Sequence, residues 1–131
     1  YVKMRHKHNR LLEVNTGAKS KSVFMRMQLS SLLRAGKLTT TPKRAKVLKA
    51  YADHFFSTLL TIYAKNDEKT AQREAIRYVK ATVYGEAEGK KVIDTFVPKY
   101  KEEGRKSGFT SEYRLGYRVG DASPKIMLKL A

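Results

Sequence analysis

The sequence predicts an α+β fold of about four helices packed on a small, mostly antiparallel sheet, preceded by a basic, extended N-terminal arm. Apolar residues recur at steps of three and four between residues 20 and 101, as on buried helix faces. The end of the chain alternates apolar and polar residues, which is typical of a strand. The 131 residues suffice for one core, and no repeat or linker divides them. We therefore expect an arm at residues 1–19 and a single α+β domain at residues 20–131.

The arm is basic, has no long periodic run and ends at Asn15-Thr16-Gly17, a sequence that breaks regular structure. Its apolar residues favour an extended segment that contacts a surface, while a disordered, solvated tail is the alternative. They are Leu11, Leu12 and Val14. His6 and His8 are too few for a zinc site, so we expect them to form hydrogen bonds within the basic arm.

The first helix is expected at residues 20–35, with Gly36 as its stop. Its apolar positions are Val23, Phe24, Met27, Leu32 and Leu33. Residues 37–40 are short and β-branched at their end, which indicates an edge strand. A long helix follows from Pro42 to about Ala64, because Thr41 offers an N-cap hydroxyl and proline suits the first helical position. Its apolar stripe comprises Ala45, Leu48, Ala52, Phe55, Phe56, Leu59, Ile62 and Tyr63.

Two further helices and two strands complete the prediction. Asp67 and Glu68 suit the start of a third helix, whose apolar positions are Ala71, Ala75, Ile76, Val79 and Val83. After a break at residues 84–87, a fourth helix is expected from Gly89 to about Lys101, carrying Val92, Ile93, Phe96, Val97 and Tyr100. Pro98 should end or kink it. Residues 102–108 form a loop, and strands at 112–119 and 125–130 flank a turn at 120–124. Ile126, Leu128 and Leu130 should face the core.

No pattern of residues indicates catalysis or a cofactor. The segment Gly85 to Lys91 has three residues between its glycines where a phosphate-binding loop needs four, and it lacks the final Ser or Thr. Asp53 and His54 are neighbours on a helix and so do not face each other. We therefore expect no enzyme, no cofactor, no metal and no small-molecule substrate. The absence of cysteine fits a reducing compartment, and the short apolar runs predict no membrane span and no signal peptide.

Charge is the strongest functional signal in the sequence. The formal net charge is +16, and residues 1–50 hold 13 Lys and Arg against one acid, Glu13, for a balance of +12. A fold gains nothing from such self-repulsion, which indicates a polyanionic partner. The sequence shows no helix-turn-helix, zinc finger or RNA-recognition sheet, so recognition by shape and backbone, as of structured RNA, is favoured. An anionic membrane surface, a nucleoid-type architectural DNA-binding protein and an RNA-modifying enzyme are the alternatives.

The start of the long helix concentrates this charge. A helix N-terminus carries a partial positive charge and favours acids, yet this one opens with cations. A bound phosphate would resolve the conflict, because free backbone N–H groups, dipole and side chains would act on one anion. We therefore predict a clamp for the phosphate backbone, formed by Thr40, Thr41, Lys43, Arg44 and Lys46.

Several segments, taken in order, resemble the bacterial-type large-subunit ribosomal protein L17 family. They are Met4-Arg5-His6-Lys7, SLLRAGKLTTTPKRAKVLK (Ser31 to Lys49), Gly108-Phe109-Thr110 and GYRVGDASPKIMLKL (Gly116 to Leu130). Departures occur at Asn15-Thr16, where the family has Asn-Arg; at Ser111, where it has Arg; and at Pro42, one place early. Arg114 is a candidate to replace the missing arginine.

The resemblance implies a few-stranded sheet packed against helices, in a protein near the peptide-tunnel outlet of the large ribosomal subunit. The implied partners are large-subunit ribosomal RNA and neighbouring ribosomal proteins, and the implied location is the cytoplasmic ribosome, with a mitochondrial or plastid ribosome left open. Family contacts with RNA map onto Arg5, His6, Lys7, Arg10, Lys43, Arg44 and Lys46. With the charge pattern, the predicted RNA-binding set becomes Arg5, His6, Lys7, Arg10, Lys19, Lys21, Arg26, Lys37, Thr40, Thr41, Lys43, Arg44, Lys46 and Lys49.

Overall fold

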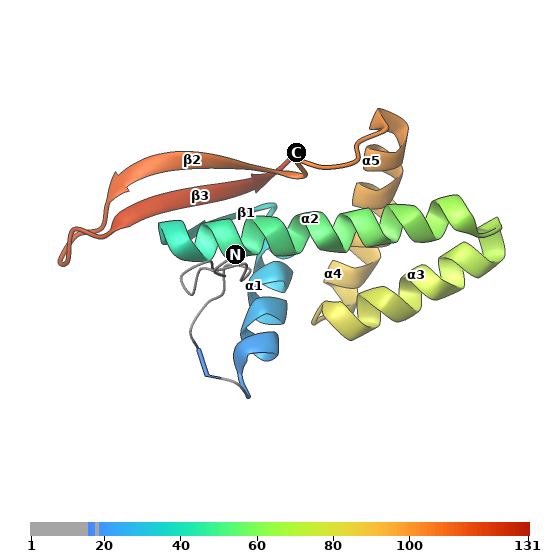
Figure 1. Ribbon diagram of the computed structural model, residues 1–131, viewed down its shortest axis with the longest axis horizontal. Coiled ribbons are helices and arrows are strands. Elements are labelled where there is room, and N and C mark those ends of the chain that lie inside the picture. The colour runs from blue at the N-terminus through green and yellow to red at the C-terminus, as the bar shows by residue number, and fades with distance from the viewer. Residues whose placement is uncertain (1–15, 18) are drawn as a thin grey trace, which may run out of the picture.

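The computed structural model describes residues 16, 17 and 19–131. Its elements, in chain order, are α1 (Lys21–Ala35), β1 (Lys37–Thr40), α2 (Pro42–Lys65), α3 (Glu68–Thr82), α4 (Glu86–Lys91), the π-helical turn η1 (Val92–Phe96), α5 (Val97–Glu103), β2 (Thr110–Tyr117) and β3 (Pro124–Leu130). Because α4, η1 and α5 are continuous, the described part of the chain has four helical rods and three strands, arranged around the long helix α2 (Figure 1). The predicted α+β class is confirmed. The predicted arm falls almost wholly outside the described residues.

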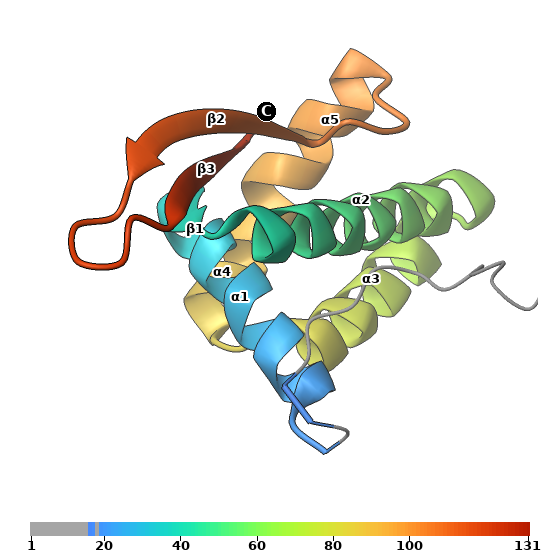
Figure 2. The same ribbon diagram turned by 60° about the vertical axis from the view of Figure 1, so that its left-hand side comes forward.

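The three strands form one antiparallel sheet in the order β1-β3-β2. β1 is an edge strand, as predicted. Ile126, Leu128 and Leu130 alternate along β3 and are all buried, which confirms that this face of the strand turns to the core. The hairpin of β2 and β3 runs alongside α2 and projects past its first residues, as Figures 1 and 2 both show.

An aromatic cluster joins the sheet to the helices. Phe56 of α2 is fully buried and lies with its ring centroid 5.0 Å from Tyr100, 5.4 Å from Phe109 and 6.1 Å from Phe96. These rings come from the middle of α2, the rod of η1 and α5, and the entry to β2. Such pairs add to the large apolar area that aromatic side chains bury. α2 therefore has a fixed position relative to the hairpin.

The predicted apolar face of α1 was partly wrong. Leu32 and Leu33 are buried, but Val23 and Met27 are 43% and 55% exposed, and Phe24 is half-buried. The buried side chains are instead Met25, Leu29, Ser30, Leu32 and Leu33. These lie at i, i+4, i+5, i+7 and i+8, a second helical stripe that the same sequence carries. Gly36 ends the helix in a left-handed conformation (φ 75°), as predicted.

The fourth helical rod starts earlier and ends later than predicted. Gly85, with φ 97°, precedes Glu86, and acids in the first turn suit a helix N-terminus. Gly89 therefore lies inside the helix, where an added Cβ would come within 3.2 Å of Val79 on α3. Pro98 does not end the rod. Proline cannot donate to the carbonyl four residues back, and the chain widens just before it into a π-helical turn, in which the Val97 N–H donates to the Val92 carbonyl.

The remaining boundaries differ by a few residues. The third helix begins after Asp67, whose carboxylate accepts from the Thr70 N–H, as its acidic start predicted. β2 runs over Thr110–Tyr117 instead of 112–119, since its pairing is set by β3 and the buried Phe109 that precedes it. The turn then occupies residues 118–123 instead of 120–124.

Candidate nucleic-acid interface

The start of α2 is a helix end without a side-chain cap. Thr41 occupies the N-cap position in extended backbone (φ −82°, ψ 160°), but its hydroxyl makes no cap hydrogen bond, so the predicted capping role was wrong. Pro42 follows and has no N–H group. The first intrahelical bond runs from the Ala45 N–H to the Thr41 carbonyl, at 2.9 Å. The N–H groups of Lys43 and Arg44 are thus donors that the helix itself does not use.

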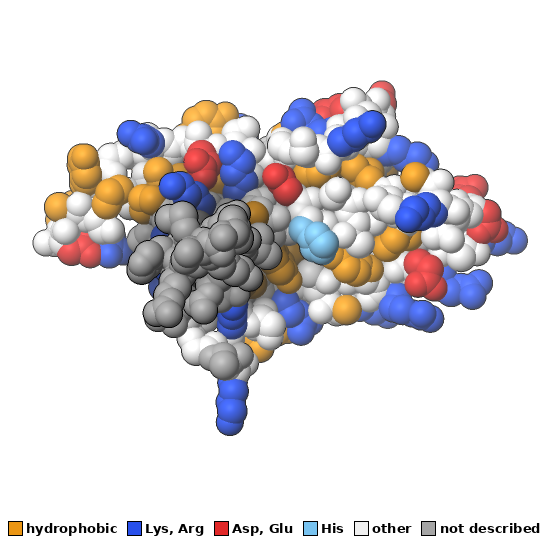
Figure 3. Space-filling model, in the orientation of Figure 1, with side chains coloured by type: hydrophobic (Ala, Val, Ile, Leu, Met, Phe, Trp, Pro, Cys, Tyr) orange, Lys and Arg blue, Asp and Glu red, His pale blue; other side chains and the backbone are white. Residues whose placement is uncertain are grey.

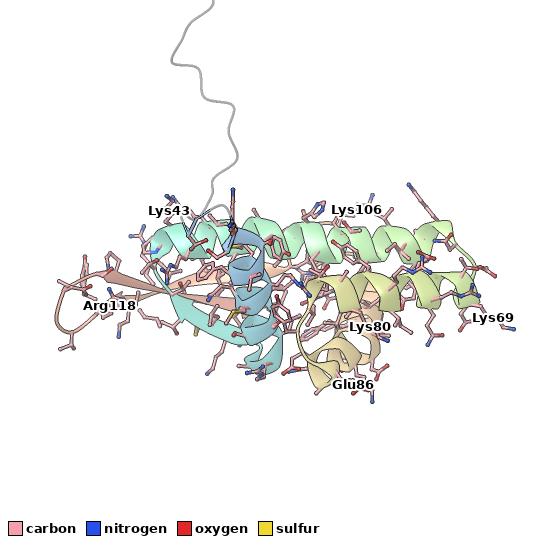
Figure 4. The ribbon with its side chains drawn as sticks, turned by 90° about the horizontal axis from the view of Figure 1, so that it is seen from below. Lys43, Lys69, Lys80, Glu86, Lys106 and Arg118 are labelled. Atoms are coloured by element: carbon pink, nitrogen blue, oxygen red, sulfur yellow. The ribbon has the colours of Figure 1, made fainter. Side chains whose placement is uncertain are left out.

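The cations of this first turn spread around the helix. Successive residues are separated by about 100° around the axis. Lys43 therefore lies opposite the buried stripe, and Figure 4 shows it projecting from the start of α2. Arg44 turns towards α1, where its guanidinium lies 5.2 Å from the Phe24 ring centroid. Lys46 turns to the other side, towards the hairpin. The predicted clamp residues share one helix end but do not converge on one point.

Among residues 16, 17 and 19–131, no acidic side chain forms an ion pair with the cations at this helix end. Between residues of the described part of the chain, the ion pairs join Arg34 to Glu88, Arg77 to Glu74, Lys90 to Glu86, Arg105 to Glu103 and Arg118 to Asp121. None of these pairs includes Lys43, Arg44, Lys46 or Lys49. Elsewhere the same kind of side chain is neutralised: hydrogen bonding to Arg34 lowers the pKa of Glu88. No carboxylate of the described residues therefore neutralises the cations at the start of α2.

A groove of about 560 Å³ lies between the start of α2 and the hairpin. Its lining comprises Pro42, Lys46, Glu112, Arg114, Gly116, Tyr117, Pro124, Lys125 and Ile126. The strand register explains this lining, since Thr40 of β1 and Arg114 of β2 both pair with Ile126 of β3 and so share one face of the sheet. On the side seen in Figure 3, hydrophobic side chains follow the projecting hairpin with Lys and Arg side chains beside them.

The turn of the hairpin is held by its own charges. Arg118 forms two hydrogen bonds to the Asp121 carboxylate, which also accepts from the Ser123 N–H at 3.2 Å. The Arg118 guanidinium, and then the Ser123 N–H, lower the pKa of Asp121 well below its usual range. Arg118 is thus engaged inside the turn, while Arg114 and Lys125 line the groove.

Sequence reasoning placed neither Arg114 nor Lys125 in the candidate site. Arg114 was considered only as a replacement for an arginine that the family has at position 111. The usable signal was the alternation of residues 125–130, which fixes the buried face of β3. The positions of the other lining residues depend on the pairing register and on the irregularity between Arg114 and Gly116, and neither can be predicted from the sequence.

The structure brings only some of the predicted RNA-binding residues together. Five of them lie within one short segment at the end of β1 and the start of α2: Thr40, Thr41, Lys43, Arg44 and Lys46. Lys49 is half-buried one turn further along α2. Lys37 pairs with Lys129 and so lies on the face of the sheet opposite to that of Thr40. Arg26 is half-buried, with its guanidinium 4.2 Å from the Tyr84 ring centroid. Lys19 is exposed before α1, and Lys21 begins it. Arg5, His6, Lys7 and Arg10 lie outside the described residues.

Asp53 and His54, which were considered as a catalytic pair, have separate surroundings in the structure. The Asp53 carboxylate accepts from the backbone N–H of Phe109 at 3.1 Å, and His54 is exposed. Within residues 16, 17 and 19–131, no cluster of three or more His, Cys, Asp or Glu side chains could hold a metal ion. In the same residues, no helix combines the length and apolar character needed to cross a bilayer.

Comparison with known proteins identifies the family. The sequence profile described as "Ribosomal protein L17" matches residues 24–131, which include all the helices and strands except the first residues of α1. The chain belongs to the ribosomal protein L17 family. The resemblance noted in the sequence is thereby confirmed.

Relatives of this L17-family chain match over most of their length. The large ribosomal subunit protein bL17 of Desulforamulus reducens is 33% identical over 110 residues, which cover 84% of this chain and 88% of the relative. The bL17 of Halothermothrix orenii is 32% identical over 115 residues, covering 88% and 90%. The bL17 of Syntrophotalea carbinolica is 33% identical over 129 residues, covering 97% of this chain and 74% of the relative.

Membership in the L17 family supports a structural role in the large ribosomal subunit, as opposed to an enzymatic one. It also supports association with the ribosome. The profile begins at Phe24, so the arm residues of the predicted RNA-binding set, together with Lys19 and Lys21, lie before the matched segment.

Proposed function

We propose that this protein is a structural component of the large ribosomal subunit, near the outlet of the peptide tunnel, that binds and organises ribosomal RNA. The contacts are made by the basic arm and by the N-terminal end of α2, and neighbouring ribosomal proteins are contacted as well. The proposal rests chiefly on one observation: the cations that open α2 have no acidic partner among the described residues, at a helix end whose hydroxyl cap is unused.

The start of α2 is electrostatically complementary to a phosphate backbone. The free N–H groups of Lys43 and Arg44 and the positive end of the helix dipole favour an anion. Three cationic side chains radiate from the same point in different directions, which suits several phosphates of a folded backbone better than one isolated ion. The fold thus presents a surface that reads RNA by its phosphates and shape.

The test is a charge reversal with a matched control on another helix. The double variant Lys43→Glu/Arg44→Glu changes the charge by the same amount as Lys69→Glu/Lys80→Glu, and Lys69 and Lys80 are exposed on α3, away from the start of α2 (Figure 4). Binding of large-subunit RNA is measured between about 50 and 200 mM salt. The first variant should bind more weakly and lose about 0.7–0.9 of salt slope for each phosphate contact removed, while the control keeps the slope.

Equal slopes for the two double variants would refute the clamp. Competition then separates the alternatives: a ribosomal RNA scaffold co-sediments with large subunits and prefers structured RNA over duplex DNA at moderate salt. A nucleoid-type DNA-binding protein shows the reverse preference. Protection mapping of the RNA in reconstituted subunits tests the position near the tunnel outlet.

A further inference from the structure

We propose that the groove between the start of α2 and the β2–β3 hairpin seats an unpaired nucleotide of the RNA, with its base against Tyr117 and its phosphates beside Lys46 and Arg114. This inference rests on the proposed RNA-binding function and assigns it a second site. The groove volume of about 560 Å³ lies within the range of small-molecule sites and is large enough for a nucleotide.

The lining of the groove combines flat apolar surfaces with cations. Tyr117, Pro42, Pro124 and Ile126 supply the apolar part. Lys46 and Arg114 supply two positive charges against the single carboxylate of Glu112. Lys125 pairs with Gly116, so its side chain alternates to the other face of the sheet. Aromatic faces that stack bases, set among cations that follow the backbone, are the usual composition of single-strand binding sites. A duplex hides the faces of its bases, so this lining favours an unpaired nucleotide.

An irregularity in β2 places Tyr117 in this groove. Arg114 pairs with Ile126 and Gly116 pairs with Lys125, which leaves Leu115 as an extra residue between them. In a regular strand, residue 116 would share the face of Arg114; with the extra residue, Tyr117 takes that place. Gly116 has φ 109°, a conformation that side chains disfavour, so glycine permits the bulge. Tyr117 is 72% exposed although the groove lies beside it.

The groove is formed before any ligand arrives. The hairpin turn next to Tyr117 is fixed by the Arg118–Asp121 pair and by the Arg118 N–H donating to the Ser123 carbonyl at 2.8 Å. On the other wall, Pro42 and Lys46 belong to the long helix α2. A site whose walls are already ordered loses little conformational entropy when it binds.

Tyr113 provides the control that the test needs. It pairs with Met127 on the opposite face of the same sheet, outside the groove, and is 49% exposed. The full chain carrying Tyr117→Ala or Tyr113→Ala is titrated with an unpaired oligonucleotide of about ten nucleotides and with an RNA duplex of about 16 base pairs. Circular dichroism verifies that both variants fold.

Tyr117→Ala should weaken binding of the unpaired strand roughly tenfold or more while leaving the duplex affinity and the salt slope unchanged. Tyr117→Phe should restore binding, and Tyr113→Ala should match the unchanged protein. A photoreactive uridine in the strand should cross-link to the peptide that contains Tyr117. Equal effects of the two alanine variants on binding of the unpaired strand, or no effect of Tyr117→Ala on it, would overturn the inference.

Failure of this inference is distinguishable from failure of the proposed function. If Lys43→Glu/Arg44→Glu weakens RNA binding and Tyr117→Ala does not, the helix end binds RNA and the groove does not. If both leave RNA binding unchanged, the proposed RNA contact at the helix end fails along with the groove.

Discussion

Replacing Lys43 by Glu should change stability and RNA binding in opposite directions. Lys43 is the second helical residue of α2, is exposed and forms no ion pair with a described residue. A cation at this position opposes the helix dipole and an acid complements it, so Lys43→Glu should raise the free energy of unfolding by about 0.3–1 kcal/mol. Arg44 is a poorer choice, because its guanidinium also packs over Phe24 and its loss would remove that contact.

Lys69 offers a control at the equivalent position of another helix. It is the second helical residue of α3, is exposed and lies at the other end of the molecule from Lys43 (Figure 4). Lys69→Glu should therefore give a similar gain in stability, measured by urea unfolding, with no change in RNA affinity. Lys43→Glu alone should lower RNA affinity and reduce the salt slope by about 0.7–0.9. A loss of stability in Lys43→Glu, or equal RNA binding by the two variants, would refute this reasoning.

Three other predictions concern the core and the entry to the hairpin. Asp53→Ala should lower the free energy of unfolding by about 1–2 kcal/mol in urea titrations, because it leaves the Phe109 N–H without its acceptor, whereas Asp53→Asn keeps an acceptor oxygen and should cost less; an equal loss in both would contradict the role of the hydrogen bond. Phe56→Ala should cost about 3–5 kcal/mol by the same assay, since the fully buried ring contacts four others; a loss below about 1 kcal/mol would show that the cluster repacks. Burial raises the pKa of Tyr100 to about 12. The side chain ionises near pH 10 in the unfolded chain. The contribution of the buried Tyr100 to the free energy of unfolding is therefore complete below about pH 10 and is lost as the pH rises towards 12. Tyr100→Phe, which cannot ionise, should flatten that decline in urea titrations across this range, and an equally steep decline in the variant would exclude Tyr100 as its source.

The elements of the fold follow from local signals in the sequence, and the errors occur where tertiary contacts decide. The continuous stripe of α2 and the alternation of β3 each offer one apolar face, so the buried residues of both were predicted, except that Ile62 and Tyr63 at the end of the α2 stripe are only partly buried. α1 offers two overlapping stripes, and only packing against α2 and the sheet selects Met25 and Leu29 over Val23 and Met27. The helical turn before Pro98 widens into a π-helical turn, and the helix continues through the proline. Propensities for α-helix do not predict such a turn.

The candidate site was predictable only where it is local in sequence. One helix start of six residues contains Thr41, Lys43, Arg44 and Lys46, so their proximity needs no tertiary information. The failure of Thr41 to cap is a matter of side-chain geometry, which the residue type does not determine. The second wall of the groove depends on residues more than 60 positions away, and their placement required the register of β2 on β3.

The register of β2 on β3 brings to the candidate site residues that the charge pattern of the sequence does not predict. The charge excess lies in residues 1–50, yet Arg114 and Lys125 belong to the more balanced remainder of the chain. Arg114 reaches the start of α2 because β3 pairs with both β2 and β1, and the last residue of β1, Thr40, is followed by Thr41 and then by the helix. A slip of one residue between β2 and β3 would turn Arg114 to the opposite face, since side chains alternate along a strand. The single extra residue at the bulge shifts the alternation of β2, and Tyr117 therefore lies on the groove face. The pairing of the last two strands therefore determines which side chains line the groove together with Lys46. The net charge of the chain does not determine this.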